Sequence, residues 1–114
     1  MYANNPSPAE VAELWLIAER ESGHNPTATN PNSSATGLFQ FILGTWQSFA
    51  TLAGVDITQY PTAASAPAVI QQTVALLLLR MVGPNSSESW QASGPYPTFQ
   101  EMQGILTSVG IANP

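Results

Sequence analysis

The sequence predicts a single all-α domain, residues 1–114, in which four to five helices surround a central apolar helix. Three observations lead to this fold class. Apolar residues recur at helical spacing in several segments, capping signals precede those segments, and nothing alternates for long enough to make a sheet. The 114 residues leave no room for a second domain, and an apolar content of 44% can fill one core.

The first predicted helix begins at Pro8. Ser7 and Glu10 form a capping box, and a proline at the first helical position costs no hydrogen bond. One broad apolar face follows, and Gly23 supplies the left-handed residue that closes a helix. The apolar face consists of Val11, Leu14, Trp15, Ile17 and Ala18.

One acidic residue, Glu21, interrupts this apolar face between Leu14 and Ile17, whereas Glu13 and Arg20 project to the other side, where we expect solvent. Partial burial and the negative end of the helix dipole both disfavour a charged Glu21, so we expect a raised pKa. A carboxyl group of raised pKa suits a general acid. The pattern is equally compatible with a glutamate at the edge of the face that reaches water.

The middle of the chain combines a polar loop with a short apolar segment. Residues 25–36 are mostly Asn, Pro, Thr and Ser, a composition that predicts a loop. Residues 37–42 are apolar with one amide, Gln40, in their middle. Taken alone, this segment fits a short buried strand or turn in which Gln40 hydrogen-bonds to the backbone.

A second helix is expected from Thr45, as its cap, through Ala53, with Gly54 as its stop. Apolar residues at helical spacing give it one buried face. We interpret Trp46, on that face, as a core residue rather than as a platform for a sugar ring. A connection rich in proline and alanine, residues 56–66, follows.

A long helix from Pro67 through Val82 is the predicted centre of the domain. It is apolar almost all round, as is typical of a helix enclosed by others. Its apolar face consists of Val69, Ile70, Thr73, Val74, Leu77, Leu78 and Met81. A last helix opens with a capping box from Thr98 to Glu101 and is expected to run to about Val109.

Composition excludes several classes of function. The net charge is −5, and Arg20 and Arg80 are the only fixed cations, so no basic patch exists for nucleic acid. The absence of cysteine excludes thiol catalysis and thiolate metal sites. His24 is the single histidine, which excludes a multi-histidine zinc site. We interpret His24 as a partly exposed packing residue.

Three segments carry a resemblance to a known family. They are Glu21-Ser22-Gly23-His24-Asn25-Pro26, Ala35-Thr36-Gly37-Leu38-Phe39-Gln40-Phe41 and Gly44-Thr45-Trp46. Together they resemble the soluble lytic transglycosylase (SLT) family of the lysozyme-like superfamily, in which a catalytic Glu-Ser at a helix end precedes Gly-Leu-(apolar)-Gln. The resemblance covers roughly Ile17 to Phe49 and implies a small lysozyme-like helical domain.

The resemblance also implies a substrate and a site. The substrate would be the glycan strands of peptidoglycan, cleaved at the β-1,4 bond between N-acetylmuramic acid and N-acetylglucosamine, with a 1,6-anhydro product and no cofactor. Glu21 would be the single catalytic acid. The residues implied to bind the sugar or hold Glu21 are Ser22, Gly37, Leu38, Phe39 and Gln40. The family's late Ala-Tyr-Asn is missing here, and Tyr96 or Tyr60 could replace its tyrosine, although both could equally be turn residues beside proline.

Two other functions remain open. A hydrolytic muramidase would use water as nucleophile and a second carboxylate, for which Asp56 is a candidate. A non-catalytic peptidoglycan-binding or virion structural module would keep the groove without the chemistry. The apolar run at residues 74–82 is too short to span a membrane, and no leader precedes Ser7. We therefore expect action on the cell wall or periplasm after delivery by another route, as for a phage-type protein.

Overall fold

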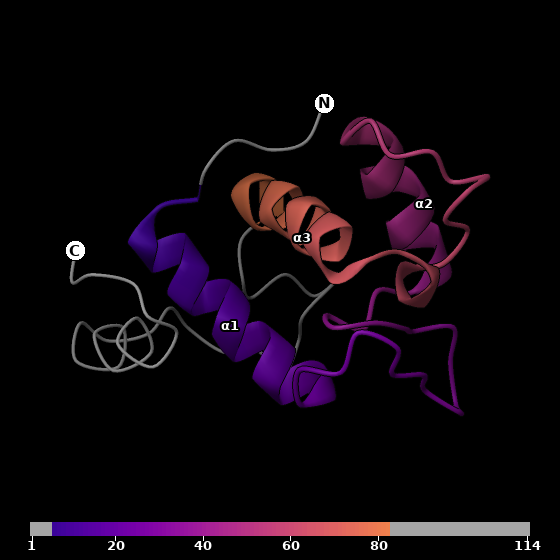
Figure 1. Cartoon of the computed structure of the whole chain (residues 1–114), viewed down its shortest axis with the longest axis horizontal. Helices are drawn as coiled ribbons and strands as arrows, with labels where there is room; N and C mark the ends of the chain where they lie inside the picture. The colour runs from indigo at the N-terminus through magenta and orange to yellow at the C-terminus, as the bar shows by residue number, and fades with distance from the viewer. Residues whose placement is uncertain (1–5, 83–114) are drawn as a thin grey trace.

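The computed structural model describes residues 6–82, which form a helical domain (Figure 1). The elements are α1 (Pro8–Ser22), α2 (Leu43–Leu52), the 3₁₀ helix η1 (Ala63–Ser65) and α3 (Ala68–Val82). Helix α3 contacts both α1 and α2 and lies between them. Residues 6–82 contain no strand, only isolated antiparallel bridges that Thr36 makes with Thr29 and Phe41. The predicted all-α class is confirmed.

The described part of the chain has fewer helices than the four to five predicted for residues 1–114. The predicted last helix, residues 98–109, lies outside the described residues, as does Tyr96. The predicted central helix corresponds to α3, which is the helix that packs against both of the others.

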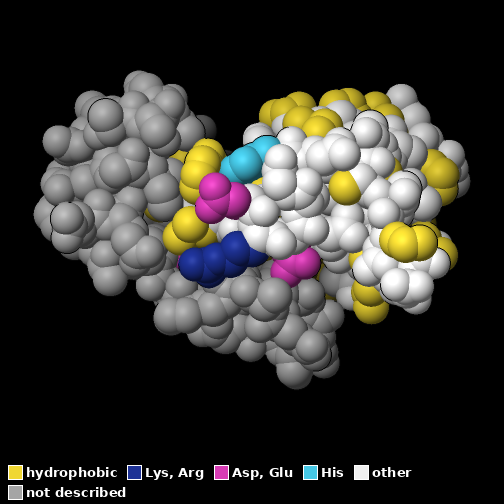
Figure 2. All heavy atoms as spheres, turned by 90° about the horizontal axis from the view of Figure 1, so that it is seen from below, with side chains coloured by type: hydrophobic (Ala, Val, Ile, Leu, Met, Phe, Trp, Pro, Cys, Tyr) yellow, Lys and Arg dark blue, Asp and Glu magenta, His cyan; other side chains and the backbone are white. Residues whose placement is uncertain are grey.

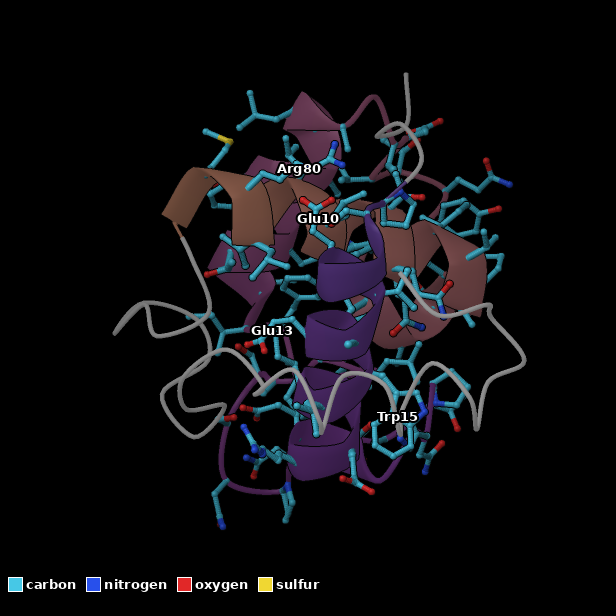
Figure 3. All side chains as sticks on the ribbon, turned by 90° about the vertical axis from the view of Figure 1, so that its left-hand side faces the viewer. Glu10, Glu13, Trp15 and Arg80 are labelled. Carbon is cyan, nitrogen blue, oxygen red and sulfur yellow. The ribbon has the colours of Figure 1, made fainter. Side chains whose placement is uncertain are left out.

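Local sequence signals fix both ends of α1. Ser7 Oγ accepts a hydrogen bond from the Glu10 N–H (3.2 Å), and the Glu10 carboxylate accepts one from the Ser7 N–H (2.9 Å). Gly23 closes the helix with a φ of 62°. Glu10 also forms a two-point ion pair with Arg80 of α3, at 2.7 and 2.9 Å (Figure 3). Its hydrogen bond to Arg80 lowers the pKa of Glu10 to about 2.

Helix α1 is buried on two sides, and this corrects the prediction made for Glu13. One side joins the main core, while Ala12 and Leu16 form a second buried cluster against which Trp15 packs. Glu13 was expected in water, but it is 0% exposed, and within residues 6–82 neither of its carboxylate oxygens has a hydrogen-bond partner. Figure 3 shows Glu13 and Trp15 on different sides of α1. Arg20 is exposed, as predicted.

Helix α2 begins earlier than predicted. Its N-cap is Ile42 rather than Thr45, and Ile42 has no side chain that can cap. Ser34 Oγ accepts the hydrogen bond of the Leu43 N–H instead, at 3.0 Å. Because Ser34 belongs to the preceding loop, a search for local capping residues does not find it. Gly54, with a φ of 83°, follows the end of the helix as predicted.

Helix α3 starts one residue after Pro67, close to its predicted start. Two members of the predicted apolar face, Val69 and Met81, are instead 65% and 58% exposed. The buried side includes Gln71, which is 0% exposed. The buried apolar residues of α3 are Ile70, Val74, Ala75, Leu76, Leu78 and Leu79. No helix within residues 6–82 combines the length and the apolar character needed to cross a membrane.

Trp46 belongs to the main core, which confirms its predicted role. Its side chain is fully buried, and its Nε1–H donates a hydrogen bond to the Tyr60 carbonyl at 2.8 Å. The Phe41 ring packs against it, with 5.6 Å between the ring centroids. The core thereby connects α2 to the segment that ends in Phe41 and to the connection that precedes α3.

Candidate active site

Glu21, the candidate catalytic acid, lies in the last turn of α1. Its side chain is half-buried, and burial raises its pKa above the ordinary value of 4.5. The predicted direction of this shift is confirmed. A carboxyl group with a raised pKa keeps its proton closer to neutral pH, which is the state that a general acid needs.

Ser22 links the end of α1 to the segment 37–40. Its Oγ–H donates a hydrogen bond to the Leu38 carbonyl at 2.7 Å, across 16 residues of sequence. The same oxygen accepts a hydrogen bond from the Asn25 N–H at 3.1 Å and lies 3.1 Å from the Ala18 carbonyl. The structure therefore brings together two parts of the predicted site, because the residue directly after Glu21 holds the backbone of Leu38.

Gly37 is required by local geometry. Its φ of 86° lies in the left-handed region, and a Cβ built there would overlap Gln71 Oε1 and lie 3.1 Å from the Ala63 Cβ. The Gly37 N–H donates a hydrogen bond to the Ala28 carbonyl at 2.8 Å. The resemblance attributes this glycine to close approach of a substrate, but its close neighbour within the fold is the Gln71 side chain.

The next three residues divide between core and surface. Leu38 and Phe39 are buried, with 5% and 1% of each residue exposed, so neither offers its side chain to a ligand. Gln40 is partly exposed, with a φ of 51°, and its Nε2–H₂ donates to the Gly37 carbonyl at 3.0 Å and the Ala28 carbonyl at 3.4 Å. Residues 37–40 therefore form a turn in which Gln40 hydrogen-bonds to the backbone, one of the conformations that the segment predicts by itself.

Gly37→Ala is expected to lower the free energy of unfolding by about 2 kcal/mol, because the alanine would adopt a left-handed conformation and crowd Gln71. Urea unfolding followed by tryptophan fluorescence measures this change. Gly44→Ala in α2 is the matched control, since a Cβ at Gly44 meets nothing within 4 Å and alanine favours the helix. Equal stability of Gly37→Ala and the wild type would contradict the steric argument.

No sequence pattern singled out Gln71, although its side chain hydrogen-bonds to three backbone groups near the site. Its Oε1 accepts a hydrogen bond from the Leu38 N–H at 2.8 Å. Its Nε2–H₂ donates to the Pro26 carbonyl at 3.0 Å and to the Ala66 carbonyl at 2.9 Å. The sequence does place Gln71 on the apolar face of α3, because it lies three residues before Val74 and seven before Leu78. That position could have indicated a buried amide.

Several other predicted residues have structural roles. His24 is exposed, and its ring packs on Trp15 with 4.6 Å between the centroids. Asp56 is exposed, and its carboxylate accepts hydrogen bonds from the Thr58 N–H and Oγ1–H. Tyr60 is half-buried against the main core. These contacts fit the packing interpretation of His24 and Tyr60.

One face of the domain carries several of its charged side chains. Figure 2 shows acidic, arginine and histidine side chains gathered close together there, next to hydrophobic ones. Among residues 6–82, no group of three or more acidic or histidine side chains is arranged to hold a metal ion.

The three helices, with a half-buried glutamate at the end of α1 tied to a Gly37–Gln40 turn, define an all-α domain of the lysozyme-like class. The chain belongs to the family described as the transglycosylase SLT domain, whose model matches residues 3–92. This membership confirms the resemblance found in the sequence.

Similar proteins come from staphylococci. A "Probable transglycosylase SceD 2" of Staphylococcus saprophyticus is 47% identical over 64 residues, which cover 56% of this chain and 24% of that protein. A "Probable transglycosylase SceD" of Staphylococcus haemolyticus is 39% identical over 72 residues, 63% of this chain and 29% of that protein. The chain thus spans about a quarter of the length of these curated relatives. No solved structure matches it.

Proposed function

We propose that this chain is a lytic transglycosylase that cleaves the β-1,4 bond between N-acetylmuramic acid and N-acetylglucosamine in peptidoglycan. The observation that carries the proposal is Glu21, a half-buried carboxyl of raised pKa joined through Ser22 to the Gly37–Gln40 turn. The family membership and the names of the relatives support it. The site of action is the cell wall or periplasm.

Glu21 acts twice in the proposed reaction. Its carboxyl proton passes to the glycosidic oxygen as the bond to C1 of the muramyl residue breaks, and N-acetylglucosamine leaves with a free 4-hydroxyl group. The Glu21 carboxylate then takes the proton of the muramyl C6 hydroxyl as that oxygen attacks C1. The product is a 1,6-anhydro sugar, Glu21 is protonated again, and no water is consumed.

Two of the other acidic side chains are engaged in contacts of their own, which supports a single catalytic carboxyl group. Glu10 is paired with Arg80, and Asp56 accepts hydrogen bonds from Thr58 at 2.6 and 2.9 Å. In the proposed reaction the acetamido group of the substrate stabilises the positive charge at C1. A second carboxylate beside Glu21 is then unnecessary, whereas the common routes of glycoside hydrolysis use two.

Binding would rest on hydrogen bonds to sugar hydroxyl and acetamido groups, because a net charge of −5 does not favour an anionic wall polymer. Ser22 and Gln40 are proposed to hold Glu21 and the sugar in place through polar contacts. The backbone of Gly37, Leu38 and Phe39 is proposed to lie along the substrate. No metal or organic cofactor takes part.

Digestion of purified sacculi tests the proposal. We expect the wild-type chain to release muropeptides that mass spectrometry finds lighter than hydrolytic products by one water. Reducing-end products of full mass would instead identify a hydrolytic muramidase and require a second carboxylate. Binding to sacculi without any release would favour a non-catalytic wall-binding module and contradict both enzymatic readings.

A further inference from the structure

Gln71 is a buried amide that joins three segments of backbone. Its side chain is 0% exposed and hydrogen-bonds the carbonyl of Pro26, the N–H of Leu38 and the carbonyl of Ala66, all at 3.0 Å or less. These residues belong to the loop after α1, the turn 37–40 and the end of the connection before α3. A buried amide with both donors and its acceptor engaged fixes its neighbours more firmly than an apolar side chain would.

Leu38 is held from both sides. Its N–H donates to Gln71, and its carbonyl accepts from Ser22 Oγ at 2.7 Å. Because Ser22 directly follows Glu21, two hydrogen bonds and the backbone of one residue, Leu38, connect α3 to the end of α1. Gly37 makes this arrangement possible, since a Cβ at that position would occupy the space of Gln71 Oε1.

We propose that Gln71 is a positioning residue that sets Glu21 relative to the Gly37–Gln40 turn, through its hydrogen bond to Leu38 and that of Leu38 to Ser22. This inference rests on the proposed function, and Gln71 itself touches no substrate. Loss of the Gln71 side chain frees the Leu38 N–H and the carbonyl groups of Pro26 and Ala66, so the turn shifts to satisfy them. A displacement of about 1 Å between acid and substrate costs roughly 100-fold in rate.

Gln71→Met, which keeps the length of the side chain, tests the proposal. Turnover of soluble glycan strands is expected to fall about 10- to 100-fold in kcat, with KM changed less than about twofold, at a temperature where circular dichroism reports the native fold. Gln72→Met is the matched control, because Gln72 is exposed and adjacent. A lower unfolding temperature with unchanged kcat would make Gln71 merely structural and overturn the proposal.

Gln71→Glu covers the case in which Gln71→Met fails to fold. Its protonated form can still accept from Leu38 and donate to one carbonyl, whereas its ionised form would face two carbonyl oxygens. Its kcat relative to the wild type is therefore expected to recover as the pH is lowered. A ratio that stays constant with pH while the fold is retained would argue against positioning through this amide.

One readout does not depend on activity. Nuclear magnetic resonance of the Glu21 side-chain carboxyl carbon follows the ionisation of that group in the wild type and both methionine variants. We expect Gln71→Met, but not Gln72→Met, to move the titration midpoint of Glu21. If the wild type releases no product, the proposed function fails, and this measurement still decides the inference: identical midpoints in all three proteins overturn it.

Discussion

Glu21→Gln is expected to reduce the release of muropeptides from sacculi by at least about 10³-fold. Glutamine keeps the size of the side chain but has no acidic proton to give to the glycosidic oxygen and cannot accept one from the C6 hydroxyl. Both proton transfers of the proposed reaction are therefore lost with one change. Mass spectrometry of timed digests measures the effect, and the fold is checked by circular dichroism.

Glu19→Gln is the matched control for this substitution. Glu19 is exposed on the same helix, two residues before Glu21, so its loss changes the net charge in the same way without touching the site. We expect it to retain activity within about twofold, as for surface substitutions generally. If Glu21→Gln kept a substantial part of the wild-type rate, Glu21 would not be the general acid.

The pH dependence of the wild-type rate follows from the raised pKa of Glu21. The acid form is the one that begins the reaction, so the rate is expected to fall as the pH rises through this pKa. Because burial places the pKa above 4.5, that descending limb lies at higher pH than an exposed glutamate would give.

Features coded by neighbouring residues could be predicted from the sequence. The capping box of Ser7 and Glu10 and the left-handed Gly23 define α1 through contacts within a few residues, so its bounds were predicted correctly. Features that depend on partners distant in the sequence could not be predicted in this way. The start of α2 is set by Ser34 from the loop, and Gln71 acts on Leu38, which is 33 residues away in sequence.

The prediction that Glu13 lies in solvent was wrong for a different reason. A helical projection assumes one buried face, and the residues opposite that face are then assigned to water. Helix α1 instead buries a second side, where Ala12 and Leu16 form their own cluster, so the position of Glu13 in the projection no longer indicates its environment. For Glu21 the same projection succeeded, because that residue borders the face which joins the main core.

The stability of the domain is expected to depend on pH through Glu13. Burial raises the pKa of Glu13 from 4.5 to about 7, and the attraction of Arg20 only partly opposes this. Below about pH 4.5 the group is protonated in both folded and unfolded chains and has no effect. As the pH rises towards 7 the unfolded chain ionises first, so stability falls, and the loss is complete above the folded-state pKa. The difference corresponds to about 3 kcal/mol.

Glu13→Gln removes this dependence, because glutamine has the same shape and cannot ionise. Urea unfolding at pH 5 and pH 8 is expected to show a loss of stability in the wild type that is smaller in the variant by roughly 2–3 kcal/mol. The ion pair of Glu10 does not change the stability between pH 5 and pH 8, because the pKa of Glu10 is about 2 and the group titrates at lower pH. Comparing wild type and variant also cancels the parallel contribution of Glu21.

Glu19→Gln again serves as control, since an exposed glutamate on α1 is expected to leave the pH dependence unchanged. A wild type and a Glu13→Gln variant that lose stability equally between pH 5 and pH 8 would mean that the Glu13 carboxylate finds water or a partner in solution. If the variant is more stable than the wild type only at pH 8, an ionised, unpartnered Glu13 is the cause of the stability that the wild type loses. The cost at neutral pH then comes from the carboxylate charge rather than from the burial of a polar group, because the buried amide of glutamine is as polar at pH 5 as at pH 8.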